Sequence, residues 1–181
     1  EIERLIARSL RAAVDLEELG PIALNVDCDI LNADGGTRCA SITAANLALR
    51  LGVRRLIASG VCLPQNMRPT EELRRSGWSA PVLSKEDQMA HEMRVMPNDV
   101  AAISVGLIDG QAYLDLDYNL DSNADVDMNV VKVSSGAFVE VQGTGEESTY
   151  QRDELDALLD MADIGFSSLI EMQKSILAGQ E

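Results

Sequence analysis

Two apolar runs around an Asp-Gly pair set the strongest limit on how this chain can fold. Residues 100–108 and 111–118 are the two runs, and Asp109–Gly110 lies between them. An Asp-Gly pair suits the tight turn of a β-hairpin. Two further apolar runs, residues 128–133 and 137–141, flank a Ser-Ser-Gly turn. The sequence therefore predicts two antiparallel hairpins.

Helical periodicity predicts three long helices around these hairpins. Residues 2–14 and 153–177 carry apolar side chains at steps of three and four, and residues 37–51 are largely apolar. Residues 22–30 alternate, which predicts a strand that buries Ile22, Leu24, Val26, Cys28 and Ile30. The order of elements predicts an α+β fold in which helices pack on one face of a mixed β-sheet.

Residues 60–98 interrupt this order. They contain four of the five prolines, Trp78, the sole histidine His91 and a helical patch at about 84–95. We interpret them as a long, lid-like insert with one helix. The length of 181 residues and the 46% hydrophobic content favour one domain over residues 1–181.

A glycine turn opens the helix predicted from residue 37. Gly35 and Gly36 let the backbone approach a ligand closely, and the first helical turn leaves N–H groups that favour an anion. Arg38 adds a fixed charge with a fork of donors. This pattern predicts a phosphate site at Gly36, Thr37 and Arg38. The alternative is a plain capped helix, with Asp34 or Thr37 as the cap and Arg38 in solvent.

Acidic residues gather after the first hairpin. Five aspartates, without a basic residue among them, fall within thirteen positions from Asp115 to Asp127. Asp121 and Asp127 could supply hard oxygen ligands to Mg²⁺, which needs only one or two carboxylates and keeps several waters. The alternative is a solvated acidic loop.

The charge of the chain is unevenly distributed. The formal net charge is −15, yet residues 1–75 hold ten basic and ten acidic side chains. Arg4, Arg8 and Arg11 share one face of the first predicted helix, where they form either a phosphate-facing row or a solvated face. Broad binding to duplex nucleic acid is not expected, because a basic surface is lacking.

Cysteine usage and hydropathy predict the compartment. The three cysteines have unrelated spacings, which indicates neither a disulfide framework nor a zinc site. No basic leader precedes an apolar run, and no run approaches about 18 apolar residues. We therefore expect a cytoplasmic protein without a membrane partner. The uncapped helix at the first residue leads us to expect that an upstream segment is missing.

Five segments together resemble the bacterial ribonuclease PH family of phosphorolytic tRNA nucleotidyltransferases. They are VDCDILNADGGTRCASIT, VAAISVGLIDG, LDLDYNLDSNADVDMNVV, FVEVQGTGE and RDELDALLDMA, in the family's order and with similar spacing. The resemblance covers nearly the whole chain outside the insert, and only the later two thirds of a typical member. It implies an RNase PH-like two-layer fold.

The resemblance also implies roles for individual residues. Gly36, Thr37 and Arg38 match the family's phosphate-binding residues, with Arg38 also catalytic, and Asp121 and Asp127 match its acidic pair for metal binding and catalysis. Inorganic phosphate would attack the last phosphodiester of a tRNA or other single-stranded RNA 3′ end, with Mg²⁺ present, and release a nucleoside diphosphate. Members process tRNA and rRNA and assemble as dimers into hexamers.

Some family features differ or are lacking here. A Gly-Gly-Arg-Thr run, whose arginine also contributes to the phosphate site, lies upstream of Glu1 in the family. Asn32, Cys39 and Gln151 replace the usual glutamine, threonine and Ser or Thr. Two hypotheses follow: a phosphate-dependent exoribonuclease, or an impaired fragment or ring subunit that binds RNA or homologous subunits without turnover.

Overall fold

The computed structural model describes residues 1–145 and 148–179. Within them, four strands form one sheet in the order β2-β1-β3-β4, and every pair of neighbours is antiparallel. Both predicted hairpins are confirmed. Asp109 (φ 52°) and Gly110 (φ 72°) make the tight turn of the first. The strands are β1 Val100–Ile108, β2 Gln111–Leu114, β3 Val126–Val133 and β4 Phe138–Gly145.

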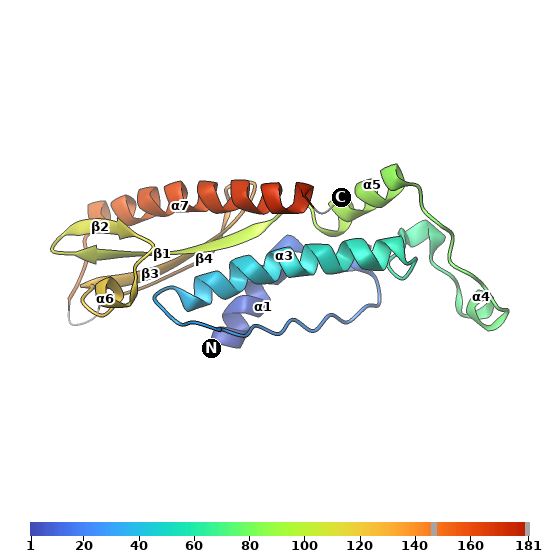
Figure 1. Ribbon diagram of the computed structural model, residues 1–181, viewed down its shortest axis with the longest axis horizontal. Helices are drawn as coiled ribbons and strands as arrows, with labels where there is room; N and C mark the ends of the chain where they lie inside the picture. Colours follow the sequence, from blue (N-terminus) through green and yellow to red (C-terminus); the bar gives the residue numbers. More distant parts are fainter. Residues whose placement is uncertain (146–147, 180–181) are drawn as a thin grey trace.

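Helices cover both faces of this sheet. Helix α7 runs along one face, and α1 and α3 lie on the other (Figure 1). Among the residues that the structure describes, none of the helices has the length and apolar composition that a membrane span requires. The helices are α1 Ile2–Ala13, α2 Leu16–Leu19, α3 Thr37–Ala58, α4 Glu71–Arg75, α5 Lys85–Val95, α6 Tyr118–Asp121 and α7 Arg152–Ala178, with a 3₁₀ turn, η1, at Gln65–Met67.

The central strand β1 explains why helices lie on both faces. Val100 and Ala102 pack in the core with α1 and α3, whereas Ile103 and Val105 pack against the α7 side. Each residue from Val100 to Leu107 is buried, as expected for a strand covered on both sides. The α+β class and the RNase PH-like fold are confirmed. Two details of the expectation were wrong, since the described sheet is wholly antiparallel and is covered on both faces.

The expected strand at residues 22–30 is extended but unpaired in the part of the chain that the structure describes. Ile22 and Leu24 are half-buried against the core formed with α1 and α3, whereas Val26, Cys28 and Ile30 are exposed. Burial of the alternate positions was therefore predicted only in part. Without this strand, the described sheet contains no parallel pair.

The insert leaves the body at the end of α3 and returns to it at the start of β1 (Figure 1). The predicted helix is α5, capped by the Ser84 hydroxyl. The expectation of one helix was incomplete, because α4 and η1 are also present. Arg50 of α3 holds the base of the insert, since its guanidinium donates to Glu92 at 3.0 Å and to Asp99 at 2.7 Å.

Candidate active site

The glycine turn before α3 packs against the backbone of residues 116–118, which belong to the acidic loop. A Cβ at Gly35 would be 2.0 Å from the carbonyl oxygen of Leu116, so only glycine fits there. Asp34 fixes this contact, because its carboxylate accepts hydrogen bonds from the N–H groups of Gly35 and Tyr118. The turn thus contacts a segment that is 84 residues away in sequence, measured from Asp34 to Tyr118.

The N-terminus of α3 has no side-chain cap. Its N-cap residue is Gly36, in the left-handed conformation (φ 69°), and the first turn contains no acidic side chain. The alternative in which Asp34 or Thr37 caps the helix is therefore not what the structure shows. The first-turn N–H groups, which carry the positive end of the helix dipole, remain available to an anion. Arg38 is exposed beside them.

Cys39 anchors this helix end to the sheet. Its thiol is buried and donates to the side-chain oxygen of Asn129 on β3 at 3.0 Å. The pKa of the Cys39 thiol is raised to about 12, mainly by burial and then by the carboxylates of Asp127 and Asp115, while Arg38 opposes this rise. Arg38 and Asp127 therefore both act electrostatically on the same thiol.

Sheet register places Asp127 on the face that α3 covers. Side chains two apart on a strand share a face, so Asp127 and Asn129 point to the same side of β3. Asp127 is opposite Gly106 on β1 and Thr144 on β4. A Cβ at Gly106 would be 2.5 Å from Leu116 Cδ1, so the side chain of Leu116 occupies the space beside this glycine. The result is a polar stretch of sheet next to the N-terminus of α3.

Asp121 lies on a different element. It is the last residue of α6, a short helix capped by the Asp117 carboxylate, which accepts from Leu120 N at 2.8 Å. Because Asp34 binds the N–H of Tyr118, α6 begins at the glycine turn. Within residues 1–145 and 148–179, no three His, Cys, Asp or Glu side chains are grouped so as to hold a metal ion.

The three arginines predicted as an RNA-contact row do not share one environment. Arg8 forms a bidentate ion pair with Glu140 on β4, at 2.9 and 3.0 Å. Hydrogen bonding to Glu140 raises the pKa of the Arg8 guanidinium. Arg11 instead lines a separate hollow between α1 and residues 22–28, and Arg4 is exposed.

A small hollow of about 100 Å³ joins Arg8 to Arg38. Glu140 and Gln142 of β4 form its wall, together with Glu1, Ile2 and Leu5. Sequence reasoning did not single out Glu140, Gln142 or Asn129. The alternation of polar and apolar residues along β4 was the available signal, but which helix would cover that face could not be read from it.

Two family models match the chain. The first domain of the 3′ exoribonuclease family matches residues 1–52, and the second domain of the same family matches residues 99–165. The insert at about 60–98 lies between the two matches. The first match includes Arg38, and the second includes Asp121 and Asp127.

Curated relatives are similar over almost the whole chain. Ribonuclease PH of Corynebacterium efficiens is 47% identical over 177 residues, which are 98% of this chain and 60% of the relative. Ribonuclease PH of Rhodopirellula baltica is 48% identical over 177 residues, which are 98% of this chain and 62% of the relative. The chain thus spans about three fifths of the length of the curated relatives it matches.

Solved structures share the fold at lower identity. An archaeal exosome core matches with a TM-score of 0.57 and 16% identity, over 96% of this chain and 62% of that one. The Archaeoglobus fulgidus exosome with RNA bound to the active site matches with a TM-score of 0.57 and 17% identity, over 94% and 59%. Taken with the ribonuclease PH relatives and both family models, the fold leads to one conclusion: the chain belongs to the ribonuclease PH family of 3′ exoribonucleases.

Proposed function

We propose that this chain forms part of a phosphate-dependent 3′-to-5′ exoribonuclease that trims tRNA 3′ ends. One observation carries the proposal: the uncapped N-terminus of α3, with Arg38 in its first turn, adjoins the sheet face that bears Asp127. A helix end and a guanidinium can bind phosphate, and a nearby carboxylate can assist the transfer. The match to ribonuclease PH relatives supports this assignment.

In this proposal, inorganic phosphate binds at Gly36, Thr37 and Arg38. An oxygen of the phosphate attacks the phosphorus of the last phosphodiester, the bond to the 3′ oxygen of the preceding nucleotide breaks, and a nucleoside 5′-diphosphate leaves. Arg38 and the α3 amides neutralise the equatorial oxygens, which is the main requirement of phosphoryl transfer. Asp127 delivers or directs the proton that the released 3′ oxygen takes up.

Asp121 and Asp127 are the side chains we assign to Mg²⁺. Carboxylate oxygens are the ligands that this ion prefers, and one or two of them suffice when water fills the other positions. When bound, the ion would supply charge for the transferring phosphoryl group.

We further infer how the chain engages its partners. Arg4, Arg8 and Arg11 of α1 contact RNA, and the chain joins copies of itself in a ring built from dimers. Residues 1–181 act as one domain with an insert at about 60–98, in the cytoplasm. A core cluster that unites α1, α3, α5 and two strands supports the single-domain proposal.

A phosphorolysis assay tests the proposal. The purified chain is incubated with a tRNA carrying a short 3′ extension, with and without phosphate and Mg²⁺, and nucleoside diphosphate release is measured. We expect phosphate-dependent release. Arg38→Ala should raise the phosphate KM about tenfold or more with RNA binding nearly unchanged, since a charge-assisted contact to phosphate is lost. Asp127→Asn should abolish turnover.

The exposed Arg74→Ala change on α4 is the control and should leave the phosphate KM unaltered. Arg38→Ala with an unchanged phosphate KM would refute the site assignment.

The second candidate is a ring subunit that binds RNA or homologous subunits without turnover. RNA binding without any phosphate-dependent release would select this candidate.

A further inference from the structure

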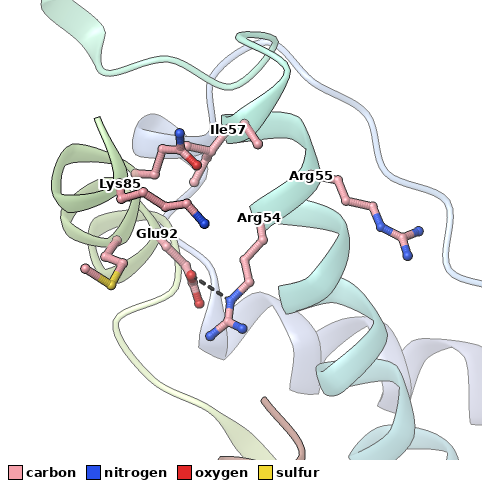
Figure 2. A pocket seen from close by; sticks show the side chains of 8 residues that line it. Arg54, Arg55, Ile57, Lys85 and Glu92 are labelled. Atoms are coloured by element: carbon pink, nitrogen blue, oxygen red, sulfur yellow. Dashed lines mark hydrogen bonds and ion pairs between the residues drawn. The ribbon is translucent and has the colours of Figure 1, made fainter. Parts of the chain in front are cut away.

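A further hollow lies at the other end of α3, where the insert helix α5 packs against it. It has a volume of about 450 Å³, within the range of roughly 300–1,000 Å³ that is usual for small-molecule sites. Along α3, Arg54 is about 24 Å from Arg38, at 1.5 Å per residue. The lining residues are Arg54, Arg55, Ile57, Ala58, Lys85, Gln88, Met89 and Glu92 (Figure 2).

Arg54 is held in a fixed position in this cavity. Its Nε donates to Glu92 Oε2 at 2.8 Å, and its Nη1 donates to the carbonyl oxygen of Leu177 at 3.0 Å. The other oxygen of Glu92 accepts from Arg50 at 3.0 Å. The one carboxylate that lines the cavity is therefore shared by two guanidiniums, and Nη2 of Arg54 still has donors to offer.

Two further cations border the cavity without an acidic partner among the described residues. Lys85 approaches from α5, and Figure 2 shows its ammonium end directed toward Arg54 and Glu92. Arg55 lies at the outer edge on α3, where Figure 2 shows its guanidinium directed away from Lys85 and Arg54, and the side chains of Arg55 and Lys85 are exposed. The lining thus holds three cationic side chains against one acidic one, in a chain whose formal net charge is −15. This local excess favours an anionic ligand.

The rest of the lining suits an apolar ring. Ala58 and Met89 supply exposed methyl and thioether surface, whereas Ile57 is buried, and a thioether packs well against an aromatic ring. Gln88 donates one amide hydrogen to Leu83 O at 2.9 Å, which fixes the side chain and leaves its carbonyl oxygen as an acceptor. A phosphate-binding end, an apolar wall and an oriented amide together match the chemistry of a nucleotide.

We infer that the cavity between α3 and α5 binds a nucleotide. Its phosphate lies against Arg54 and Lys85, and its base lies against Met89 and Ala58. The ligand is a free mononucleotide or one nucleotide of an RNA strand, which share this chemistry. The inference goes beyond the proposed function, because the cavity is at the opposite end of α3 from Arg38 and half of its lining comes from the insert.

Methyl NMR tests the inference by reporting on the cavity itself. The chain is labelled at its methionine methyl groups, and the Met89 signal is identified with Met89→Leu. We expect adenosine monophosphate to shift the Met89 signal, and adenosine or inorganic phosphate alone to shift it less. The double change Arg55→Gln and Lys85→Gln should weaken binding about tenfold, because the Lys85 contact to the phosphate and the positive charge at the edge of the cavity are both lost. Both side chains are exposed, and an otherwise unchanged methyl spectrum verifies the fold.

The matched control is Arg74→Gln with Arg75→Gln, which removes two exposed cations from α4 and should leave binding unchanged. Arg38→Ala should also retain the Met89 shift, so failure of the proposed exoribonuclease site is distinguished from failure of this one. Tighter binding of the mononucleotide than of hexa-adenylate indicates a free ligand, and the reverse order indicates RNA. The inference is overturned if neither ligand shifts Met89 at about 10 mM, or if the double change has no effect.

Discussion

Gly35 is the residue in the glycine turn with the least space. The carbonyl oxygen of Leu116 would be 2.0 Å from a Cβ at this position, and a backbone atom cannot rotate away as a side chain would. We expect Gly35→Ala to lower the free energy of unfolding by about 1–3 kcal/mol, the usual effect of overpacking. Urea unfolding followed by circular dichroism measures this change. A variant as stable as the parent would contradict the packing of the turn on residue 116.

The residues of the candidate site were predictable to different extents. The glycine turn and the helix that begins at Thr37 were predicted from local chemistry, because such a turn determines its own geometry, and phosphate binding by Gly36, Thr37 and Arg38 stays a prediction. Partners that lie far apart in sequence were not identified. Arg8 and Glu140 are 132 residues apart, and Cys39 and Asn129 are 90 apart, so both pairs depend on how the sheet faces the helices.

At the scale of elements, α3 is longer than its sequence predicted. The prediction ended it near Gly52, but the helix continues to Ala58 because Val53 and Ile57 are buried in the core. No atom lies within 4 Å of a Cβ built on Gly52. Tertiary packing therefore outweighs the low helix propensity of glycine at this point.

We expect Gly52→Ala to raise the free energy of unfolding by about 0.5–1 kcal/mol, because alanine favours the helix more than glycine does. The same urea measurement detects it, with an effect opposite in sign to that of Gly35→Ala. A loss of stability would mean that the side of α3 at residue 52 is more crowded than the structure describes.

The segment at residues 22–30 leads to a prediction about hydrogen exchange. Among the described residues, no backbone N–H from Ala23 to Leu31 donates a hydrogen bond to another backbone group. We expect these amides to exchange nearly as fast as those of an unfolded peptide, whereas those of β1 exchange slowly. Mass spectrometry of deuterated fragments compares the two. Strong protection at 22–30 would reveal a strand partner outside the described contacts.

The elements themselves were predicted where local sequence determines them. The Asp109–Gly110 turn specifies the first hairpin and its register, and the periodicity of residues 153–177 predicted α7. The alternation at 22–30 predicted an extended backbone but could not supply a neighbouring strand, because pairing is not local. The continuous apolar run in β1 indicated that both faces of this strand are buried. The expectation that helices pack on only one face of the sheet overlooked this signal.

For the whole molecule, His91 links stability to pH. The ring is fully buried, with Cys62 at 3.6 Å from Nε2 and Glu18 at 3.7 Å from Nδ1. Burial lowers the pKa of His91 from 6.5, Arg94 and Arg68 lower it further, and Glu18 and a hydrogen bond to Leu63 oppose them. The folded chain therefore holds this imidazole neutral at a pH where the unfolded chain protonates it.

Because the pKa is lower in the folded state, the stabilising contribution is complete above pH 6.5 and is lost as the pH falls below it. We expect the urea midpoint to fall between about pH 7.5 and about pH 5.5, and His91→Gln to flatten this dependence. His91 is the sole histidine, so no other imidazole contributes. An equally steep dependence in the variant would assign the effect to other groups.

The insert is pinned to the body by two arginines near its base. Arg50 binds the carbonyl oxygens of Met96 and Asn98 as well as Glu92 and Asp99, and Arg68 donates to the carbonyl oxygens of Glu17, Glu18 and Leu63. The stretch around α4 lies outside these anchors and buries none of its own helix residues. This outer tip is thus the place where the chain can be lengthened, trimmed or given a fluorescent label while the sheet keeps its shape.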